Sequence, residues 1–296
     1  FTNTRLSETF ELDYVNKMSA EGLLRRCESY QQGICPEGVL LLTQGVDCQI
    51  DRLEVSTWGW GKGEEAFLID HVQLWGDPHQ AEVWKQLQII INQQYEHENG
   101  KSLVPVISAI DSGGLHTSEV YQFTREKVAQ GVIAIKGQSQ ANKPVIGRPS
   151  RVDINFRKIN KAIKKGGLVY PLGVDTIKNT LMGRLKNNKI GSDGYIHFHA
   201  DTSEEYFKQL TSERQMLKTN RAGFQIPQWV LPYNVRNECL DCFVYSYAAM
   251  CLYISPYNRN TVWQQLENKF NEGDKVVKPK RATIKPNTNN NFVNSW

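Results

Sequence analysis

Three aspartates lie within or at the end of strongly apolar stretches of the sequence. Asp111 closes the strand-like run in "VISAIDSGG", and Asp47 follows a second apolar run in "LLLTQGVDC". Asp241 lies inside the long apolar segment "RNECLDCFVYSYAAMCLYI", about one helical turn after Glu238. Acids in such surroundings are rarely buried without a partner. Carboxylates brought together repel each other, and a divalent cation held by their oxygens removes that penalty.

Three acids from two strands and a helix suit the hydrolysis of a phosphodiester by two metal ions. In that chemistry two ions about 3.5–4 Å apart activate a water molecule and stabilise the departing oxygen. The sequence therefore predicts that Asp47, Asp111 and Asp241 are catalytic and bind two divalent cations. Glu238, one turn nearer the start of the predicted helix, is predicted as a further metal ligand.

Each of these acids also has a plain structural interpretation. Asp followed by Gly is common in turns, so Asp111 and Asp47 could simply end their strands. Asp241 and Glu238 fall near the start of a predicted helix, where the helix dipole favours acids. The four positions together favour the metal site for the three aspartates, whereas both interpretations of Glu238 stay open.

The acids need a scaffold that brings the first and fourth strands side by side. Apolar and alternating runs predict three antiparallel strands over residues 38–75 and further strands ending at Asp111 and near residue 137. This order predicts an α/β fold with a mixed sheet flanked by helices. Helices are expected over 77–100, 115–130, 152–167, from about 175, over 203–217 and over 236–254.

A block of positive charge follows the fifth predicted strand. The whole chain carries a formal net charge of +4, but the segment from Arg148 to Lys189 is +9 and the rest is −5. Such a block favours a polyanionic partner such as DNA, whose phosphates give salt-dependent and largely sequence-independent affinity. A solvated helix face is the alternative. The predicted DNA-binding residues are Lys136, Arg148, Arg151, Arg157, Lys158, Lys161, Lys164 and Lys165.

Composition divides the chain into three parts. Residues 1–35 are predicted to form an arm or linker, 36–256 the folded domain with its basic insert at about 137–190, and 257–296 a flexible basic tail. Six scattered cysteines lack the pattern of a small secreted domain, which favours a reducing compartment. No apolar run approaches the roughly 18 residues that span a bilayer, so no membrane partner is expected.

Lambda-type phage terminase large subunits resemble this sequence in their C-terminal nuclease portion. The resemblance covers roughly residues 38–254 and rests on four stretches in the family's order, "GVDCQIDRLEVSTWGWGKGEEAFLID", "AIDSGG", "VIAIKG" and "RNECLDCFVYSYAA". It implies a ribonuclease H-like fold and an endonuclease that cuts concatemeric double-stranded viral DNA during packaging. It also implies Mg²⁺ or Mn²⁺ as the ions and 5′-phosphate and 3′-hydroxyl ends on the products. Asp47, Asp111 and Asp241 match the family's metal-binding acids, and Glu238 matches an auxiliary ligand position.

The resemblance further implies partners and a location. A terminase small subunit would choose the cut site, the portal protein would receive the C-terminal tail, and the host bacterial cytoplasm would be the place of action. The tail itself matches no motif of the family. The family's N-terminal ATPase is not carried over, because the sequence has no G-x-x-x-x-G-K-[ST] phosphate loop.

Two other functions fit the same features. One is a DNA-gripping or portal-docking module of the packaging motor, in which the acids serve structure only. The other is a transposase or resolvase of the same fold, which would show strand transfer or a preference for four-way junctions. Metal-dependent cleavage that is lost on replacing Asp111, with DNA binding kept, separates a nuclease from a gripping module.

Overall fold

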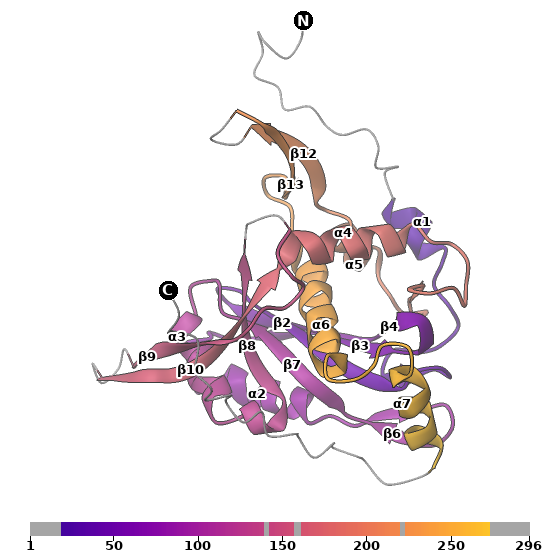
Figure 1. Cartoon of the computed structure of the whole chain (residues 1–296), viewed down its shortest axis with the longest axis horizontal. Helices are drawn as coiled ribbons and strands as arrows, with labels where there is room; N and C mark the ends of the chain where they lie inside the picture. Colours follow the sequence, from indigo (N-terminus) through magenta and orange to yellow (C-terminus); the bar gives the residue numbers. More distant parts are fainter. Residues whose placement is uncertain (1–18, 139–141, 157–160, 220–222, 273–296) are drawn as a thin grey trace, which may run out of the picture.

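The computed structural model describes residues 19–138, 142–156, 161–219 and 223–272, and a mixed sheet of eight strands forms its centre (Figure 1). The strands are β2 (Leu41–Cys48), β3 (Arg52–Trp60), β4 (Ala66–Trp75), β7 (Pro105–Asp111), β8 (Val132–Gln138), β9 (Ser150–Phe156), β10 (Lys161–Gly173) and β11 (Ile196–His197). Their order across the sheet is β11-β4-β3-β2-β7-β8-β10-β9.

The first three long strands form the predicted antiparallel meander, and the next two extend it in parallel. β2 pairs antiparallel with β3 on one side and parallel with β7 on the other, and β8 continues parallel to β7. The predicted α/β class is confirmed, and a meander followed by two parallel strands beside its first strand is the ribonuclease H-like arrangement. This order makes the first and fourth strands of the prediction, β2 and β7, direct neighbours.

Helices cover both faces of the sheet. They are α1 (Ala20–Leu24), α2 (Ala81–Ile91), α3 (Thr117–Arg125), α4 (Val174–Leu185), α5 (Glu204–Leu210), α6 (Glu238–Ile254) and α7 (Val262–Asn271). Residues alternate along β8: Ile133 and Ile135 belong to the core with α4, α5 and α6, whereas Val132 and Ala134 belong to the core with α2 and α3. The period of two along a buried strand thus builds two separate cores.

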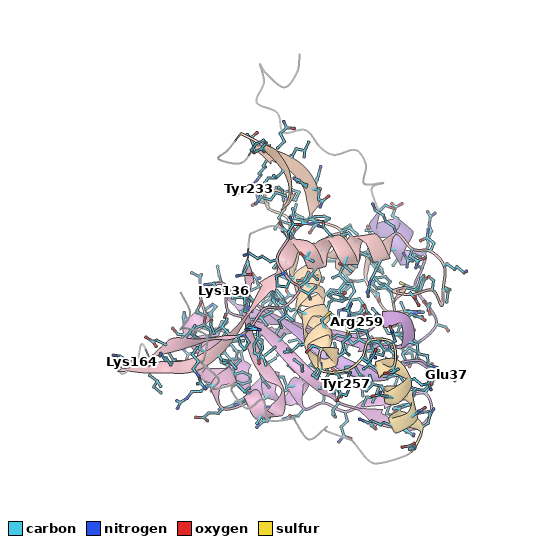
Figure 2. All side chains as sticks on the ribbon, in the orientation of Figure 1. Glu37, Lys136, Lys164, Tyr233, Tyr257 and Arg259 are labelled. Atoms are coloured by element: carbon cyan, nitrogen blue, oxygen red, sulfur yellow. The ribbon has the colours of Figure 1, made fainter. Side chains whose placement is uncertain are left out.

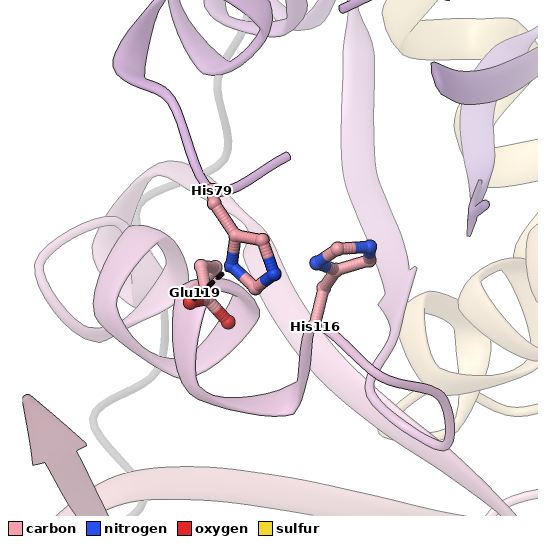
Figure 3. A group of neighbouring side chains, drawn as sticks. All are labelled: His79, His116 and Glu119. Atoms are coloured by element: carbon pink, nitrogen blue, oxygen red, sulfur yellow. Dashed lines mark hydrogen bonds and ion pairs between the residues drawn. The ribbon is translucent and has the colours of Figure 1, made fainter. Parts of the chain in front are cut away.

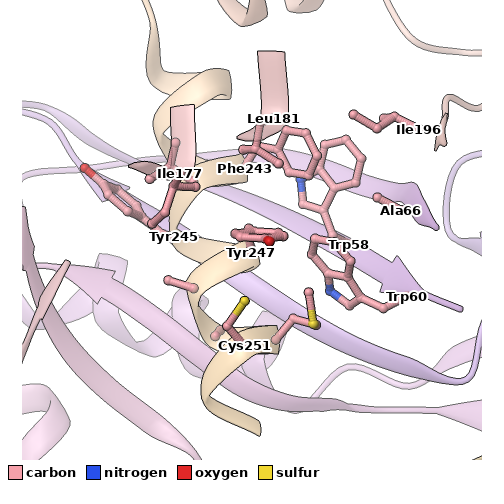
Figure 4. Close-up of a cluster of buried hydrophobic side chains, with 14 of the residues drawn as sticks. Trp58, Trp60, Ala66, Ile177, Leu181, Ile196, Phe243, Tyr245, Tyr247 and Cys251 are labelled. Atoms are coloured by element: carbon pink, nitrogen blue, oxygen red, sulfur yellow. The ribbon is translucent and has the colours of Figure 1, made fainter. Parts of the chain in front are cut away.

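Aromatic side chains fix α6 on its face of the sheet (Figure 4). The rings of Trp58 on β3 and Phe243 on α6 stack with centroids 3.7 Å apart and planes 14° apart. Thr43 on β2 donates a hydrogen bond from Oγ1 to the carbonyl of Ser246 (2.9 Å) and accepts one from Trp60 Nε1 (2.8 Å). Nearly every residue of α6 is buried, which explains why its sequence is apolar on all sides.

Smaller elements complete the structure. A minor sheet joins β1 (Ile34–Cys35), β5 (Tyr95–His97) and β6 (Ser102–Leu103), and 3₁₀ turns cover Lys62–Glu64 and Val128–Gln130. A separate antiparallel hairpin, β12 (Arg214–Thr219) and β13 (Gln225–Val230), projects beyond α4 and α5 in Figure 1. Within the described ranges, no helix has both the length and the apolarity to cross a bilayer.

The predicted helix over 152–167 is wrong, because this segment is part of a hairpin of β9 and β10. The two strands pair antiparallel with Ile163 opposite Ile154 and Gly167 opposite Val152. Val152 and Ile154 repeat every second residue, which is the period of a strand, and Ile154 is fully buried. The hairpin extends away from the body of the sheet, and Figure 2 shows Lys164 near its end.

Three other predicted helices are shorter than expected. The helix over 77–100 becomes α2, which ends at Ile91 before β5, and the helix over 115–130 becomes α3 with a separate 3₁₀ turn. The helix over 203–217 ends at Leu210, and its second half pairs as β12 with β13. A helical pattern in the sequence cannot reveal such a distant strand partner. The helices predicted from about 175 and over 236–254 are confirmed as α4 and α6.

Both predicted terminal segments contain folded parts. Residues 19–35 are packed against the domain rather than forming a free arm: Leu23 is fully buried in the core, and Tyr30 donates a hydrogen bond to the carbonyl of Leu68 (3.0 Å). Helix α7 lies within the predicted flexible tail, with Val262 and Trp263 buried. Residues 1–18 and 273–296 lie outside the described part of the chain.

Candidate metal centre

Asp47 and Asp111 lie next to each other at the ends of neighbouring parallel strands. The register of β2 and β7 places Val46 opposite Ile110, and each aspartate is the next residue along its strand. Asp47 is 6% exposed, and Asp111 is partly exposed at the last position of β7. The predicted neighbourhood of these two acids is therefore confirmed in the structure.

Asp241 reaches the same place because α6 packs directly on β2. The contact is possible because Gly45 has no side chain: a Cβ there would lie 1.9 Å from the carbonyl oxygen of Cys242 and 2.9 Å from the backbone nitrogen of Ser246. Cys242 also donates a hydrogen bond from Sγ to the carbonyl of Glu54 on β3 (3.3 Å). The first turn of α6, with Asp241, is thereby held over the ends of β2 and β7.

Burial and repulsion from nearby acids disturb the ionisation of all three aspartates. Burial raises the pKa of Asp47 well above its usual range, and the nearby charges of Asp241 and Asp111 raise it further. Burial raises the pKa of Asp111 to about 6, although the backbone N–H of Gly113 and the charge of Lys136 oppose this. Burial also raises the pKa of Asp241, against the charge of Lys178. A divalent cation would stabilise the charged form of each.

Amide and ammonium groups hold the carboxylates in place. Gln49 donates from Nε2 to Asp47 Oδ2 (2.5 Å), and the N–H of Gly113 donates to Asp111 Oδ1 (3.1 Å). Asp241 Oδ2 accepts from Asn237 Nδ2 (2.9 Å), and Asp241 Oδ1 lies 3.2 Å from Lys178 Nζ.

Sequence reasoning missed the role of Lys178. It belongs to the basic block, yet it is buried on α4 and pairs with Glu213 (2.5 Å) as well as with Asp241. A lysine surrounded by the polar pattern of "VDTIKNT" gives no local signal of burial. Its positive charge offsets part of the negative charge of the three aspartates.

Glu238 lies in a network of arginines beside the aspartates. Its carboxylate pairs with Arg52 Nη2 (2.9 Å) and with Arg236 Nε (3.1 Å). The same two arginines pair with the fully buried Glu54. Metal binding by Glu238 stays a prediction, and in this structure its oxygens serve the arginines.

The aspartates offer a set of hard oxygen donors that fits Mg²⁺ or Mn²⁺. Among the described residues, the oxygens of the three do not all lie within 4.8 Å of one another.

The basic residues divide between the surface and buried ion pairs. Lys136, which extends β8 past Asp111, is exposed (Figure 2), as are Arg148, Arg151, Lys164 and Lys165 on or near the β9–β10 hairpin. Lys161 lies at the start of β10, whereas Arg157 and Lys158 fall outside the described residues. Within the described part of the basic block, Lys178 forms a buried ion pair with Glu213, and Arg184 forms a partly buried one with Glu64.

The metal-free chain is expected to lose stability as the pH rises from about 4 to about 7. A carboxyl group whose pKa is higher in the folded than in the unfolded state stabilises the fold. This contribution is fully present at a pH below the unfolded pKa, and it is lost as the pH rises through the folded pKa. For Asp111, with a folded pKa of about 6, the loss is up to about 3 kcal/mol at roughly 1.4 kcal/mol per pKa unit. The free energy of unfolding, measured with urea in the presence of a chelator, should depend less on pH for Asp111→Asn than for the native chain. Equal pH dependence of the two chains would contradict the raised pKa of Asp111.

Known proteins match almost the whole chain. The family model "Terminase large subunit gpA, endonuclease domain" matches residues 1–294. The chain is 34% identical to the terminase large subunit of Escherichia phage lambda over 263 residues, which is 86% of this chain and 39% of that protein. It is 32% identical to the terminase large subunit of Enterobacteria phage P21 over 257 residues, 84% of this chain and 38% of that protein. The chain therefore spans less than half the length of these relatives.

A solved structure with low sequence similarity also matches. It is a mutant nuclease domain of the large terminase subunit of bacterial virus Sf6 with manganese, with a TM-score of 0.40 and 11% identity. The match covers 71% of this chain and 88% of that one.

Proposed function

The chain belongs to the family of terminase large subunit gpA endonuclease domains, and we propose that it is the metal-dependent endonuclease that cuts concatemeric double-stranded DNA during viral genome packaging. The observation that carries the proposal is the meeting of Asp47, Asp111 and Asp241 at one end of the sheet. One buried and two partly buried acids, all with raised pKa values, are costly for a fold, and cation-dependent chemistry gives them a use.

In this proposal Asp47, Asp111 and Asp241 would hold two divalent cations, Mg²⁺ or Mn²⁺. When bound, such ions activate water and stabilise the departing oxygen of a phosphodiester. The chain's own groups orient the ligands: Gln49, Gly113 and Asn237 donate to the three carboxylates. Glu238 would become a metal ligand only by giving up an ion pair with Arg52 or Arg236.

Lys178 has a positioning role in the same proposal. Its Nζ bridges Asp241 and Glu213, so it fixes the start of α6 relative to α4 and lowers the net negative charge. Lys136, exposed beside Asp111, would contact a phosphate of the bound DNA. The expected products carry 5′-phosphate and 3′-hydroxyl ends.

The β9–β10 hairpin would bind the DNA backbone alongside the cut site. β10 pairs with β8, which itself pairs with β7, so the hairpin continues the sheet from the strand that carries Asp111. Arg148, Arg151, Lys164 and Lys165 are exposed there, and Arg157, Lys158 and Lys161 would add to the same contact. Their contacts would supply affinity without reading the base sequence.

Replacing Lys164 and Lys165 together by Gln is expected to weaken DNA binding and to make the binding less dependent on salt. Each lost phosphate contact should lower the slope of log affinity against log salt by about 0.9, so the double variant should lose about 2. Fluorescence anisotropy with a labelled duplex over a salt series measures the slope. The matched control replaces Lys85 and Lys208, exposed lysines on α2 and α5, and an equal loss there would contradict a hairpin footprint.

The wider context of the proposal follows the family. A terminase small subunit would select the site, a portal protein would bind the tail beyond residue 272, and the host bacterial cytoplasm would be the place of action. Co-precipitation of the native chain and of a chain ending at residue 272 with portal protein tests the role of the tail.

Nicking of supercoiled plasmid with Mn²⁺, Mg²⁺ or chelator tests the activity directly. Cleavage that requires metal supports the endonuclease, whereas metal-independent binding without cleavage supports the gripping module. Joining of DNA strands or a preference for four-way junctions would instead support a transposase or resolvase.

A further inference from the structure

A second group of ligand-type side chains contains none of the three aspartates. His79, His116 and Glu119 each offer one ligand atom, and these atoms all lie within 4.8 Å of one another. His79 precedes α2, His116 immediately precedes α3, and Glu119 lies in the first turn of α3. Figure 3 shows the two imidazole rings and the carboxylate converging from these separate segments.

The geometry of the group is compact. His79 Nδ1 lies 2.9 Å from Glu119 Oε1, and the rings of His79 and His116 have centroids 4.6 Å apart at an interplanar angle of 65°. The second carboxylate oxygen of Glu119 is buried and has no hydrogen-bond partner among the described residues. A buried carboxylate oxygen without a partner is costly, and a cation would remove that cost.

The segment around His79 is held in shape by its own contacts. Asp77 Oδ1 accepts a hydrogen bond from the backbone N–H of His79 (2.8 Å), and Trp84 donates from Nε1 to the carbonyl of Pro78 (2.8 Å). His116 is 4% exposed, whereas the side chain of His79 is 42% exposed. One histidine is thus buried, and the other faces solvent, where an ion can enter.

We propose that His79, His116 and Glu119 form a second metal site, for a transition-metal ion such as Zn²⁺. Two imidazole nitrogens and one carboxylate oxygen are a donor set that Zn²⁺ uses in proteins, whereas Mg²⁺ prefers oxygen ligands alone. The donor chemistry therefore separates this site from the all-oxygen aspartate site.

A bound ion here would connect the segment before α2 to the turn that follows Asp111. His116 follows Asp111 by five residues, and the hydroxyl of Thr117 lies 2.8 Å from the carbonyl oxygens of both Ser112 and Gly114, which share its one proton and fix the intervening turn. The ion would tie this turn to the segment before α2. The site is therefore suited to stabilising the loop that follows Asp111.

Zinc binding to the full chain carrying Asp47→Asn and Asp111→Asn tests the proposal, because these changes disable the aspartate site. Isothermal titration calorimetry with ZnCl₂ alone should give one equivalent per chain. Adding His79→Ala, at an exposed position that should not disturb folding, should weaken zinc binding at least tenfold, since even changes to groups behind metal ligands cost about 10–100-fold. Glu119→Gln should also weaken it, whereas the control Glu82→Gln, at an exposed acid on α2, should not.

A spectroscopic measurement identifies the ligands independently of affinity. Long-range ¹H–¹⁵N spectra of the histidine rings should show nitrogen shifts for His79 and His116 on addition of zinc, with the other four histidines unchanged. Zinc that binds without shifting these two rings, binds equally after His79→Ala, or does not bind at all would overturn the proposal.

Discussion

Asp111→Asn is expected to abolish metal-dependent nicking of supercoiled plasmid while leaving the fold and DNA binding intact. Loss of outer groups behind a metal ligand typically costs about 10–100-fold in affinity or activity, so loss of a ligand itself should cost more than about 100-fold. The substitution should not destabilise the fold, because it removes a carboxyl group whose negative charge is unfavourable here: burial raises its pKa to about 6. The metal-free variant should be more stable than the native chain at neutral pH.

The nicking assay needs a control acid that lies outside the site. Asp51 follows Asp47 by four residues, and its side chain is 59% exposed beside Arg52. Asp51→Asn should retain cleavage close to the native level in Mn²⁺ and in Mg²⁺. Circular dichroism and duplex binding should be measured for both variants, so that a lost activity is not mistaken for a lost fold.

Each outcome of this experiment favours a different function. Cleavage by the native chain that is lost in Asp111→Asn, with DNA binding kept, supports the endonuclease proposal. Native-level cleavage by Asp111→Asn would exclude Asp111 as a metal ligand. Binding without cleavage in both chains would favour the gripping module, with the three aspartates serving the structure alone.

Gly45→Ala is expected to destabilise the domain by about 3 kcal/mol or more. A methyl group at this position would meet the carbonyl oxygen of Cys242 at 1.9 Å and the backbone nitrogen of Ser246 at 2.9 Å. Both obstacles are backbone atoms of α6, so relief requires moving the helix rather than turning a side chain. Overpacking of a core typically costs about 1–3 kcal/mol, and a backbone clash falls at the upper end of that range or beyond it.

The same substitution should weaken cation binding, because moving α6 moves Asp241 away from Asp47 and Asp111. Chemical unfolding measures the stability, and Mn²⁺ titration of the folded variant measures the binding. The matched control is Gly183→Ala on α4, where an added Cβ meets nothing within 4 Å. In an exposed helix Ala is favoured over Gly by roughly 1 kcal/mol, so this control should be neutral or stabilising. Equal stability of the Gly45→Ala and native chains would contradict the close packing of α6 on β2.

The sequence by itself determined the type of most elements and the residues of the candidate site. The apolar run before Asp47, the run ending at Asp111 and the apolar helix around Asp241 all carry their signal locally, in the period of their side chains. The order of these elements predicted the antiparallel meander and allowed the first and fourth strands, β2 and β7, to be neighbours, whereas their parallel pairing came from the structure. The aspartates were predictable because acids in apolar segments are unusual wherever they occur.

The tertiary structure alone decided the neighbours that local patterns do not encode. The segment 152–167 became a hairpin because β9 and β10 pair with each other, and Lys178 became a buried partner of Asp241 because α4 packs beside α6. Glu238 met Arg52 because α6 also packs against β3. Pairing between strands and burial of charges depend on residues distant in the chain, so their free energies are fixed only when the whole fold brings the partners together.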